Sequence, residues 1–277
     1  MLRSRAVPAA CALMLVLAAC GQDNAPPEGV SVSLQQWRSD ETAHALQVAV
    51  RNESATPVHF ADVQLITDSF EVLPPETIGS TLASTPRTDL RIPYGRARCT
   101  PDRVPEMRPA TVVAHLRVGD GDLREVRFDL PHPEPLLSKL LVAECGAFLI
   151  TQVADFGFGA EWVRAGDALR GTVRVSRRGG GERVTVHELG DTTNYTLRPL
   201  RAGEPVAVLS GGADRLDIPV QVRAARCDPH AFAEAKKGFV FPVWASVGAG
   251  ETRHLTFTPP QATRSTFNNF ARDVCGL

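Results

Sequence analysis

The chain contains two related halves, and this duplication constrains its fold more than any other feature of the sequence. The segment DLRIPYGRARCTPD at residues 89–102 is similar to RLDIPVQVRAARCDPH at residues 215–230, with an Ile-Pro pair, an Arg-Cys pair and a later proline in common. A period of this length is typical of two copies of a whole domain rather than of a short-repeat solenoid. The similarity continues, at an offset between 126 and 130, from residues 112–131 to 241–260 and from 142–146 to 271–276.

Both halves are expected to be mainly β. Apolar and polar residues alternate in residues 45–51, 111–118 and 168–176, the period of a half-buried strand. The glycines and aspartates of residues 119–122 predict a hairpin turn, and the Arg/Gly run at residues 177–181 predicts another. About six to eight short strands per copy, separated by Pro/Gly turns, predict two tandem immunoglobulin-like β-sandwich domains.

Each domain is expected to end in a short helix. Residues 133–146 open with two prolines, place leucines at helical spacing and end at Gly146. In the second copy Phe267 and Phe270 share one helical face, and Gly276 is the predicted end. Such apolar stripes are expected to pack into a core.

The N-terminus has the features of an export signal. Arg3 and Arg5 precede a mostly apolar stretch of signal-peptide length, which is too short to span a bilayer comfortably. It ends in Leu17-Ala18-Ala19-Cys20, which resembles the lipobox of bacterial lipoproteins. The resemblance implies cleavage before Cys20 and attachment of a diacylglycerol to its sulfur, so that acyl chains hold the mature protein on a membrane. An ordinary secretory signal, with Cys20 incidental, is the alternative.

These features divide the chain into four parts. We expect a lipoprotein signal peptide at residues 1–19, followed by the lipidated Cys20 and a polar, Pro/Gly-rich tether at residues 20–29. The first β-sandwich copy is expected at residues 30–146 and the second at residues 147–277.

Four cysteines remain for the folded part of the chain. Export places them in an oxidising compartment, which favours disulfides, and four cysteines allow three connectivities. If the two copies fold alike, equivalent cysteines have equivalent partners within each copy. The duplication therefore predicts the disulfides Cys99–Cys145 and Cys227–Cys275.

Composition and motifs argue against several classes of function. The formal net charge is −1, and it becomes −3 when Arg3 and Arg5 leave with the signal, so we expect no nucleic-acid partner. The sequence has no Gly-x-Ser-x-Gly elbow, no His-Glu-x-x-His motif and no phosphate-binding glycine loop. We therefore expect a protein without a cofactor that is not an enzyme.

Two further features are candidate sites. Phe156, Phe158 and Trp162 lie in a Gly-rich stretch that would line a ligand groove or fill the seam between the domains. The three tryptophans, Trp37, Trp162 and Trp244, are otherwise expected in the cores.

His230 stands three residues after Cys227, a spacing that suits a metal site. The first copy has Asp102 at that position, however, and no methionine follows His230 as a copper loop would require.

We therefore expect a lipid-anchored protein on the extracytoplasmic face of the cell membrane. It would bind or organise an unidentified envelope or extracellular protein, or a small ligand, without catalysis. The alternative is a metal-binding or enzymatic envelope protein that uses His230, His187 and nearby carboxylates.

Overall fold

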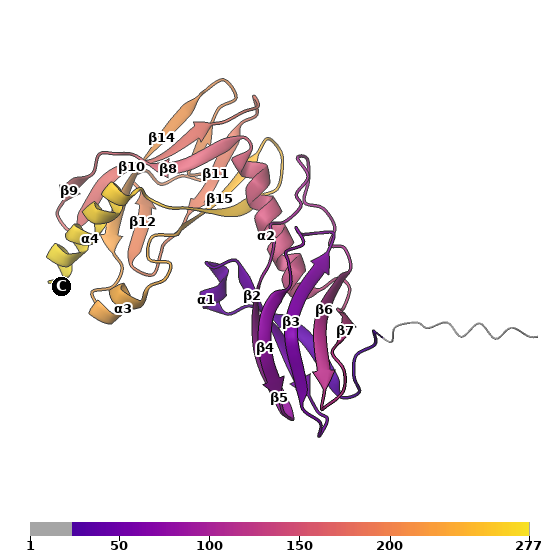
Figure 1. Cartoon of the computed structure of the whole chain (residues 1–277). Helices are drawn as coiled ribbons and strands as arrows, with labels where there is room; N and C mark the ends of the chain where they lie inside the picture. Colours follow the sequence, from indigo (N-terminus) through magenta and orange to yellow (C-terminus); the bar gives the residue numbers. More distant parts are fainter. Residues whose placement is uncertain (1–23, 277) are drawn as a thin grey trace, which may run out of the picture.

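The computed structural model describes residues 24–276, so the signal segment and Cys20 lie outside the described residues. The described chain is mainly β, with several antiparallel sheets, and forms two lobes joined by the helix α2 (Pro135–Thr151) (Figure 1). The first lobe comprises strands β1 to β7 and helix α1, and the second lobe comprises strands β8 to β16 and helices α3 and α4. Within residues 24–276, no helix is long and apolar enough to cross a membrane.

The first lobe contains two antiparallel sheets around one core. Apolar residues of both sheets meet in this core, among them Val48, Phe60 and Leu116, each at most 1% exposed. The short helix α1 (Arg38–Glu41) connects β1 to β2. One sheet has the order β1-β2-β5, from β1 (Val30–Gln35), β2 (Ala45–Asn52) and β5 (Thr85–Pro93); the other has the order β4-β3-β6-β7, from β3 (Val58–Thr67), β4 (Glu76–Leu82), β6 (Ala110–Val118) and β7 (Arg124–Asp129).

The second lobe repeats this arrangement with additional elements. Its core again draws on both sheets and includes Val186, Val220 and Phe241, each fully buried. One sheet has the order β12-β14-β10-β8, from β8 (Ala154–Phe158), β10 (Ala168–Arg177), β12 (Tyr195–Pro199) and β14 (Arg215–Ala224), with β9 (Val163–Ala165) paired to β10. The other has the order β13-β11-β15-β16, from β11 (Val184–Leu189), β13 (Ala207–Leu209), β15 (Phe241–Val247) and β16 (Arg253–Phe257); α3 (Pro229–Glu234) and α4 (Gln261–Cys275) complete the lobe.

The two lobes correspond strand by strand. The sheet β1-β2-β5 matches β8-β10-β14, and β4-β3-β6-β7 matches β13-β11-β15-β16. Each lobe also has a register shift at an equivalent place, between Phe60 and Asp62 in β3 and between Val186 and Glu188 in β11. A bulge of this kind bends the strand and raises its twist, so the two lobes share a local distortion as well as a strand order.

Both predicted disulfides are confirmed. Cys99, in the loop after β5, is bonded to Cys145 of α2, and Cys227, in the loop before α3, is bonded to Cys275 at the end of α4. Each bridge therefore ties a helix to the loop that follows the corresponding strand.

One of the two predicted hairpins is correct. Residues 119–122 join β6 to β7, which pair along their length, and Gly119 has a φ of 54°. Residues 177–181, in contrast, connect β10 to β11, which belong to different sheets. A Gly-rich turn between two alternating strands suits a crossover between sheets as well as a hairpin, because both strands still face the same core.

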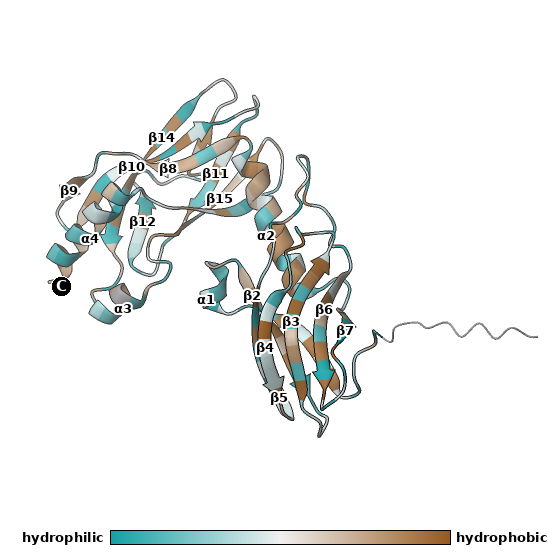
Figure 2. Ribbon diagram, viewed as in Figure 1, coloured by the Kyte–Doolittle hydropathy of each residue, from teal (hydrophilic) through white to brown (hydrophobic). Residues whose placement is uncertain are grey.

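Of the two predicted helix ends, the second is correct. Gly276 follows α4 and has a φ of 66°, the left-handed conformation that glycine accommodates best. Helix α2 continues past Gly146 to Thr151, because Leu141 packs in the first core and Ile150 in the second. Burying the Ile150 side chain stabilises the folded protein by about 2 kcal/mol. This outweighs the cost of about 1 kcal/mol for a glycine inside a helix. Figure 2 shows α2 as hydrophobic along much of its length.

Candidate binding cleft between the lobes

A cleft lies between the two lobes. Its first wall is helix α1, which is held in place by the buried residue Asp40. The carboxylate of Asp40 accepts hydrogen bonds from Gln47 Nε2 at 2.8 Å, from Arg91 Nε at 3.0 Å and from the backbone amide of Trp37 at 3.2 Å. Burial alone would raise the pKa of Asp40, but these donors bring that pKa below its usual value. With Asp40 directed inward, Arg38, Ser39 and Glu41 are exposed.

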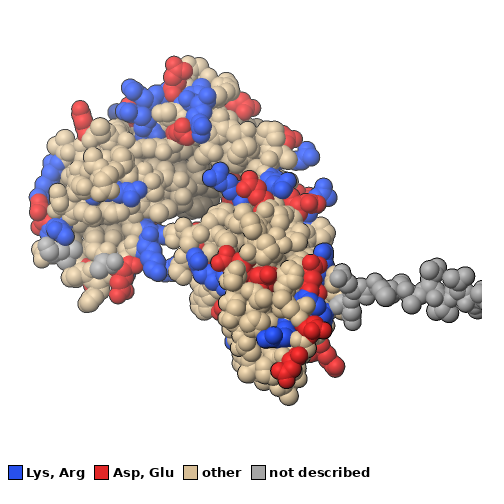
Figure 3. Space-filling view, viewed as in Figure 1, with Lys and Arg blue, Asp and Glu red and all other residues tan. Residues whose placement is uncertain are grey.

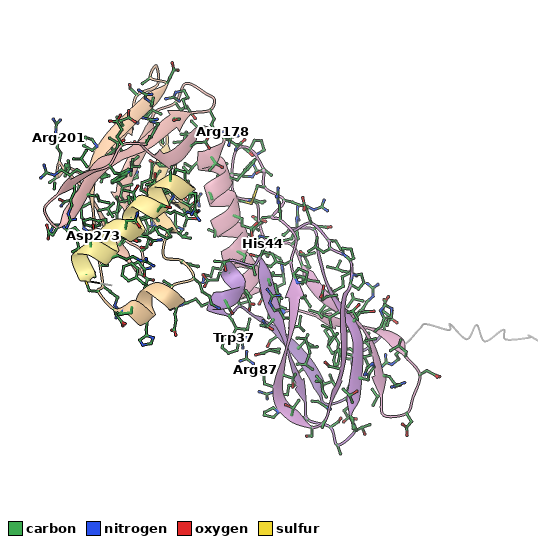
Figure 4. The ribbon with its side chains drawn as sticks, turned by 60° about the vertical axis from the view of Figure 1, so that its left-hand side comes forward. Trp37, His44, Arg87, Arg178, Arg201 and Asp273 are labelled. Atoms are coloured by element: carbon green, nitrogen blue, oxygen red, sulfur yellow. A yellow bond between two sulfur atoms is a disulfide. The ribbon has the colours of Figure 1, made fainter. Side chains whose placement is uncertain are left out.

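An exposed aromatic side chain borders this wall. Trp37, which precedes α1, is 52% exposed, and the guanidinium of Arg87 lies 5.5 Å from the centre of its ring. Figure 4 shows the two side chains together at the end of the first lobe that carries α1. The expectation that Trp37 belongs to the core is therefore wrong, because the alternation of β1 ends at Gln35 and the chain then turns into α1.

The second wall is formed by α3 and the residues that follow it. Asp228 begins α3 by accepting a hydrogen bond from the amide of His230 at 3.0 Å. Phe232 of α3 makes an edge contact with the buried Tyr195, at 5.9 Å between ring centres. The Tyr195 hydroxyl in turn donates to Asn268 Oδ1 of α4 at 2.9 Å. These contacts tie the wall to the second core.

A cleft of about 740 Å³ lies between the two walls. Lys237 of the second wall forms an ion pair with Glu41 of the first. Burial, and to a smaller extent the charge of Lys237, lowers the pKa of the nearby His254. Figure 3 shows Lys and Arg side chains on both lobes where they face each other. The charged lining comprises Arg38, Arg226, Lys236 and Lys237 against Glu41 and Glu234.

The cations outnumber the carboxylates in this lining. A cleft with an excess of one charge raises the local concentration of ligands of the opposite charge. Next to Thr193 of the lining, the buried side-chain oxygen of Asn194 has no hydrogen-bond partner among the described residues. The excess of cations therefore favours an anionic ligand in the cleft.

The separation of the walls depends on how α2 is fixed to the first lobe. His44 Nδ1 lies 2.8 Å from the carbonyl oxygen of Tyr94, and His44 Nε2 lies 3.1 Å from Glu144 Oε1 of α2. Glu144 also accepts the amide of Ala97 at 2.9 Å, next to the Cys99–Cys145 bridge. Figure 4 places His44 where α1 and α2 approach each other.

The conformation of His44 is unusual. Its φ is 51°, the left-handed region in which a side chain is strained. Its ring stacks on that of Tyr94, with ring centres 3.9 Å apart, and burial together with the charge of Glu144 raises the pKa of Tyr94 to about 12. Because these contacts over-determine the strained residue, His44 acts as a positioning residue for α2.

The predicted aromatic stretch packs against the second core. Phe158 is only 9% exposed and packs on Phe257 with ring centres 4.8 Å apart, inside the second core. Trp162 makes an edge contact with Phe267 of α4 at 4.8 Å, and Phe156 also packs against this core. Phe158 and Trp162 thus pack against Phe267 of α4, and Phe156 packs against Phe257 of β16. Phe156 and Trp162 stay half-buried, and a ligand or interface site at Phe156, Phe158 and Trp162 stays a prediction.

The two candidate histidines lie on different elements. His230 is exposed in the first turn of α3, whereas His187 of β11 contacts Ser246 Oγ through Nε2 at 2.8 Å. Among residues 24–276, no group of three or more His, Cys, Asp or Glu side chains is arranged to hold a metal ion.

A second cleft, of about 750 Å³, lies on the other side of the junction. The loop at residues 101–103 of the first lobe faces turns of the second lobe there, and Gln152 Nε2 donates to the carbonyl of Pro101 at 3.4 Å. Its charges are mixed, with Arg103 and Arg253 against Asp102, Glu182 and Glu251. This cleft has no excess of positive charge.

Sequence reasoning missed the first cleft. The α1 residues follow a segment in which apolar and polar residues alternate as in a strand. The residues of the second wall belong to a loop whose sequence has no matching motif in the first copy. The available signal was the pair Lys236-Lys237, since Lys139 is the only other lysine in the chain.

Comparison with known proteins does not identify a family. No family model and no curated protein matches the chain. A solved structure of the exo-beta-D-glucosaminidase CsxA, from work on its inhibition by castanospermine and amino-australine analogues, aligns with 82% of this chain and 26% of its own, at 13% identity and a TM-score of 0.19. The chain thus spans about a quarter of that enzyme, and a likeness this weak carries no argument about fold or function.

Proposed function

We propose that the protein is a lipid-anchored envelope protein whose two tandem immunoglobulin-like domains bind an acidic segment of a partner protein in the cleft between them. The anchor is Cys20, at the end of the lipobox-like Leu17–Cys20 segment, and the folded part lies on the extracytoplasmic face. The role is non-catalytic: the protein holds or organises its partner at the membrane surface.

The domain assignment is supported by the strand orders. The first lobe has a three-strand sheet facing a four-strand sheet, and the second lobe has the seven corresponding strands with β9 and β12 added to its first sheet. The connections β2 to β3 and β10 to β11 cross from one sheet to the other. Seven antiparallel strands arranged in this way are typical of immunoglobulin-like sandwiches. We place the two domains on either side of α2, so that the predicted boundary between residues 146 and 147 falls within this helix.

The observation that carries the binding proposal is the charge of the cleft. Cationic side chains line it from both lobes, and the exposed Trp37, with Arg87 against its ring, directly precedes the α1 wall. Tryptophan and arginine are the residues most enriched among those that dominate protein–protein binding energy. An acidic peptide segment would satisfy the excess cations, while an apolar side chain of the partner would pack on Trp37.

Site-specific photo-crosslinking in cells tests this proposal. A photoreactive phenylalanine at Ser39, an exposed residue of the cleft lining, is expected to capture a partner. The same group at Val163, which is 69% exposed on β9, is the matched control position. Capture of the same protein with equal yield from both positions, or of none from Ser39, would contradict a partner in the cleft.

Charge reversal tests the electrostatic part separately. Replacing Arg38 and Lys236 by Glu changes one cation on each wall. Each replacement removes a favourable charge pair with the acidic partner, worth about 0.5–1 kcal/mol, and adds repulsion. Together they are expected to weaken binding roughly tenfold or more. Replacing Lys139 and Arg201 by Glu alters the net charge equally at exposed positions outside the cleft. We expect capture to be lost in the first double variant and kept in the second.

A further inference from the structure

The described chain begins with a segment that is attached to the edge of the first lobe. The backbone amide of Arg127, in the edge strand β7, donates to the carbonyl of Asn24 at 2.8 Å. The guanidinium of Arg124 donates to the carbonyl of Ala25 at 3.1 Å. Residues 24 and 25 therefore lie along β7 and cover part of its exposed edge, where unpaired backbone groups would otherwise invite pairing with other chains.

The attachment continues up to β1. The amide of Val30 donates to Pro27 at 3.1 Å, and the amide of Glu53 donates to Gly29 at 2.8 Å. Gly29 has a φ of 73°, and a Cβ there would lie 3.1 Å from the amide nitrogen of Ser54. The stretch that sequence analysis assigned to a tether is thus part of the first lobe from residue 24 onward.

This attachment shortens the distance that the chain can span from a lipid on Cys20. Four residue steps separate Cys20 from Asn24, which reach at most about 14 Å when fully extended. A tether free as far as Val30 would reach about 35 Å. The radius of gyration of a domain of about 100 residues is about 13 Å, so the far side of the lobe lies beyond the shorter reach.

We infer that the β7 edge of the first lobe is held against the bilayer surface and that the cleft is directed away from the membrane. This rests on the proposed anchor at Cys20. In Figure 1, β7 and α1 lie on opposite sides of the first lobe, so a membrane next to β7 leaves α1 on the free side. The charges around β7 are mixed, with Arg124 and Arg127 beside Glu125 and Asp129. The short attachment, and not attraction to anionic lipid, therefore sets the orientation.

Energy transfer from the protein to labelled lipid tests the orientation. The acylated full-length protein is reconstituted in vesicles of phosphatidylethanolamine and phosphatidylglycerol that carry a headgroup acceptor. A donor is attached either at Asp122→Cys, in the exposed turn before β7, or at Arg201→Cys, which Figure 4 places on the second lobe, far from Trp37 and Arg87 of the first. We expect efficient transfer from position 122 and weak transfer from position 201.

A flexible Gly/Ser insertion between Gln22 and Asp23 is expected to lower transfer from position 122 and bring the two values together. The same insertion at Gly180, a turn position with open space around it, leaves both values unchanged. If the protein without an insertion binds the vesicles but shows equal transfer from both positions, the inferred orientation is wrong while the anchor still holds. Acylated protein that does not float with the vesicles would overturn the anchor itself.

Discussion

The replacement Asp40→Asn tests how the first wall of the cleft is held. It keeps the shape of the side chain but removes the charge that three donors share. One oxygen of Asp40 accepts from Gln47 and Trp37 and the other from Arg91, so the asparagine oxygen can satisfy the first pair. Its amide group then faces the Arg91 guanidinium, donor against donor.

The expected loss of stability follows from the exposure of each partner. The Asp40 side chain is 4% exposed, whereas that of Arg91 is 55% exposed and can turn to water at small cost. Gln47 is buried, and its bond to the carboxylate weakens when the acceptor becomes neutral. A change from charged to neutral acceptor costs about 1 kcal/mol per bond, so Asp40→Asn lowers the free energy of unfolding by about 2 kcal/mol.

The difference between the two proteins also depends on pH. The folded state lowers the pKa of Asp40, so the stabilisation is complete above the unfolded-state value of about 3.9. It is lost as the pH falls through the lower folded-state value. We therefore expect the stability difference to be constant at neutral pH and to shrink below about pH 4.

Urea unfolding followed by tryptophan fluorescence measures this difference. Asp89→Asn is the control, because Asp89 is paired with Arg87 at the surface of the same sheet and its replacement costs at most about 1 kcal/mol. Equal stability of Asp40→Asn and the parent at neutral pH would refute the reasoning. A stability difference between Asp40→Asn and the parent that stays the same below about pH 4 would also refute it.

Four further predictions concern other parts of the molecule. Gly171→Ala is expected to destabilise the second lobe by about 1–3 kcal/mol, because the added Cβ would lie 2.6 Å from the Trp162 ring. Gly157 has open space around it, so Gly157→Ala is the control and is expected to show no such loss in thermal unfolding. Replacing Cys227 and Cys275 together by Ser lowers the unfolding free energy by about 4 kcal/mol for a loop of 48 residues, and an unchanged denaturation midpoint would contradict this. His44→Gly is expected to be less destabilising than His44→Ala by about 1 kcal/mol, since only the alanine retains the strain at a φ of 51°, and equal losses would show that strain is unimportant there. Elemental analysis of the purified protein is expected to find no stoichiometric copper or zinc, and a metal lost in His230→Ala would favour the metal-binding alternative.

Much of the fold followed from patterns that are local or repeated. The alternation in residues 111–118 and the glycine turn after them predict β6 and β7, because each strand has one face toward a core. The disulfide partners followed from the duplication, since equivalent cysteines occupy equivalent places. These features need no knowledge of how distant segments meet.

Other features depend on contacts that the local sequence does not encode. The continuation of α2 beyond Gly146 requires a second core for Ile150, which exists only once the second lobe has folded. The packing of Phe158 and Trp162 requires α4, more than 100 residues later, to fold back so that Phe267 contacts both rings. The cleft, likewise, needs α1 and α3 to face each other, and neither segment carries a motif.

Helix α2 has a consequence for how the molecule melts and how it can be divided. Because one uninterrupted helix supplies Leu141 to one core and Ile150 to the other, unfolding either lobe strips the helix of part of its support in the other. The two lobes should therefore lose structure cooperatively. Any fragment cut between residues 146 and 147 would sacrifice a helical turn that one lobe needs, so viable halves would have to overlap across the whole helix.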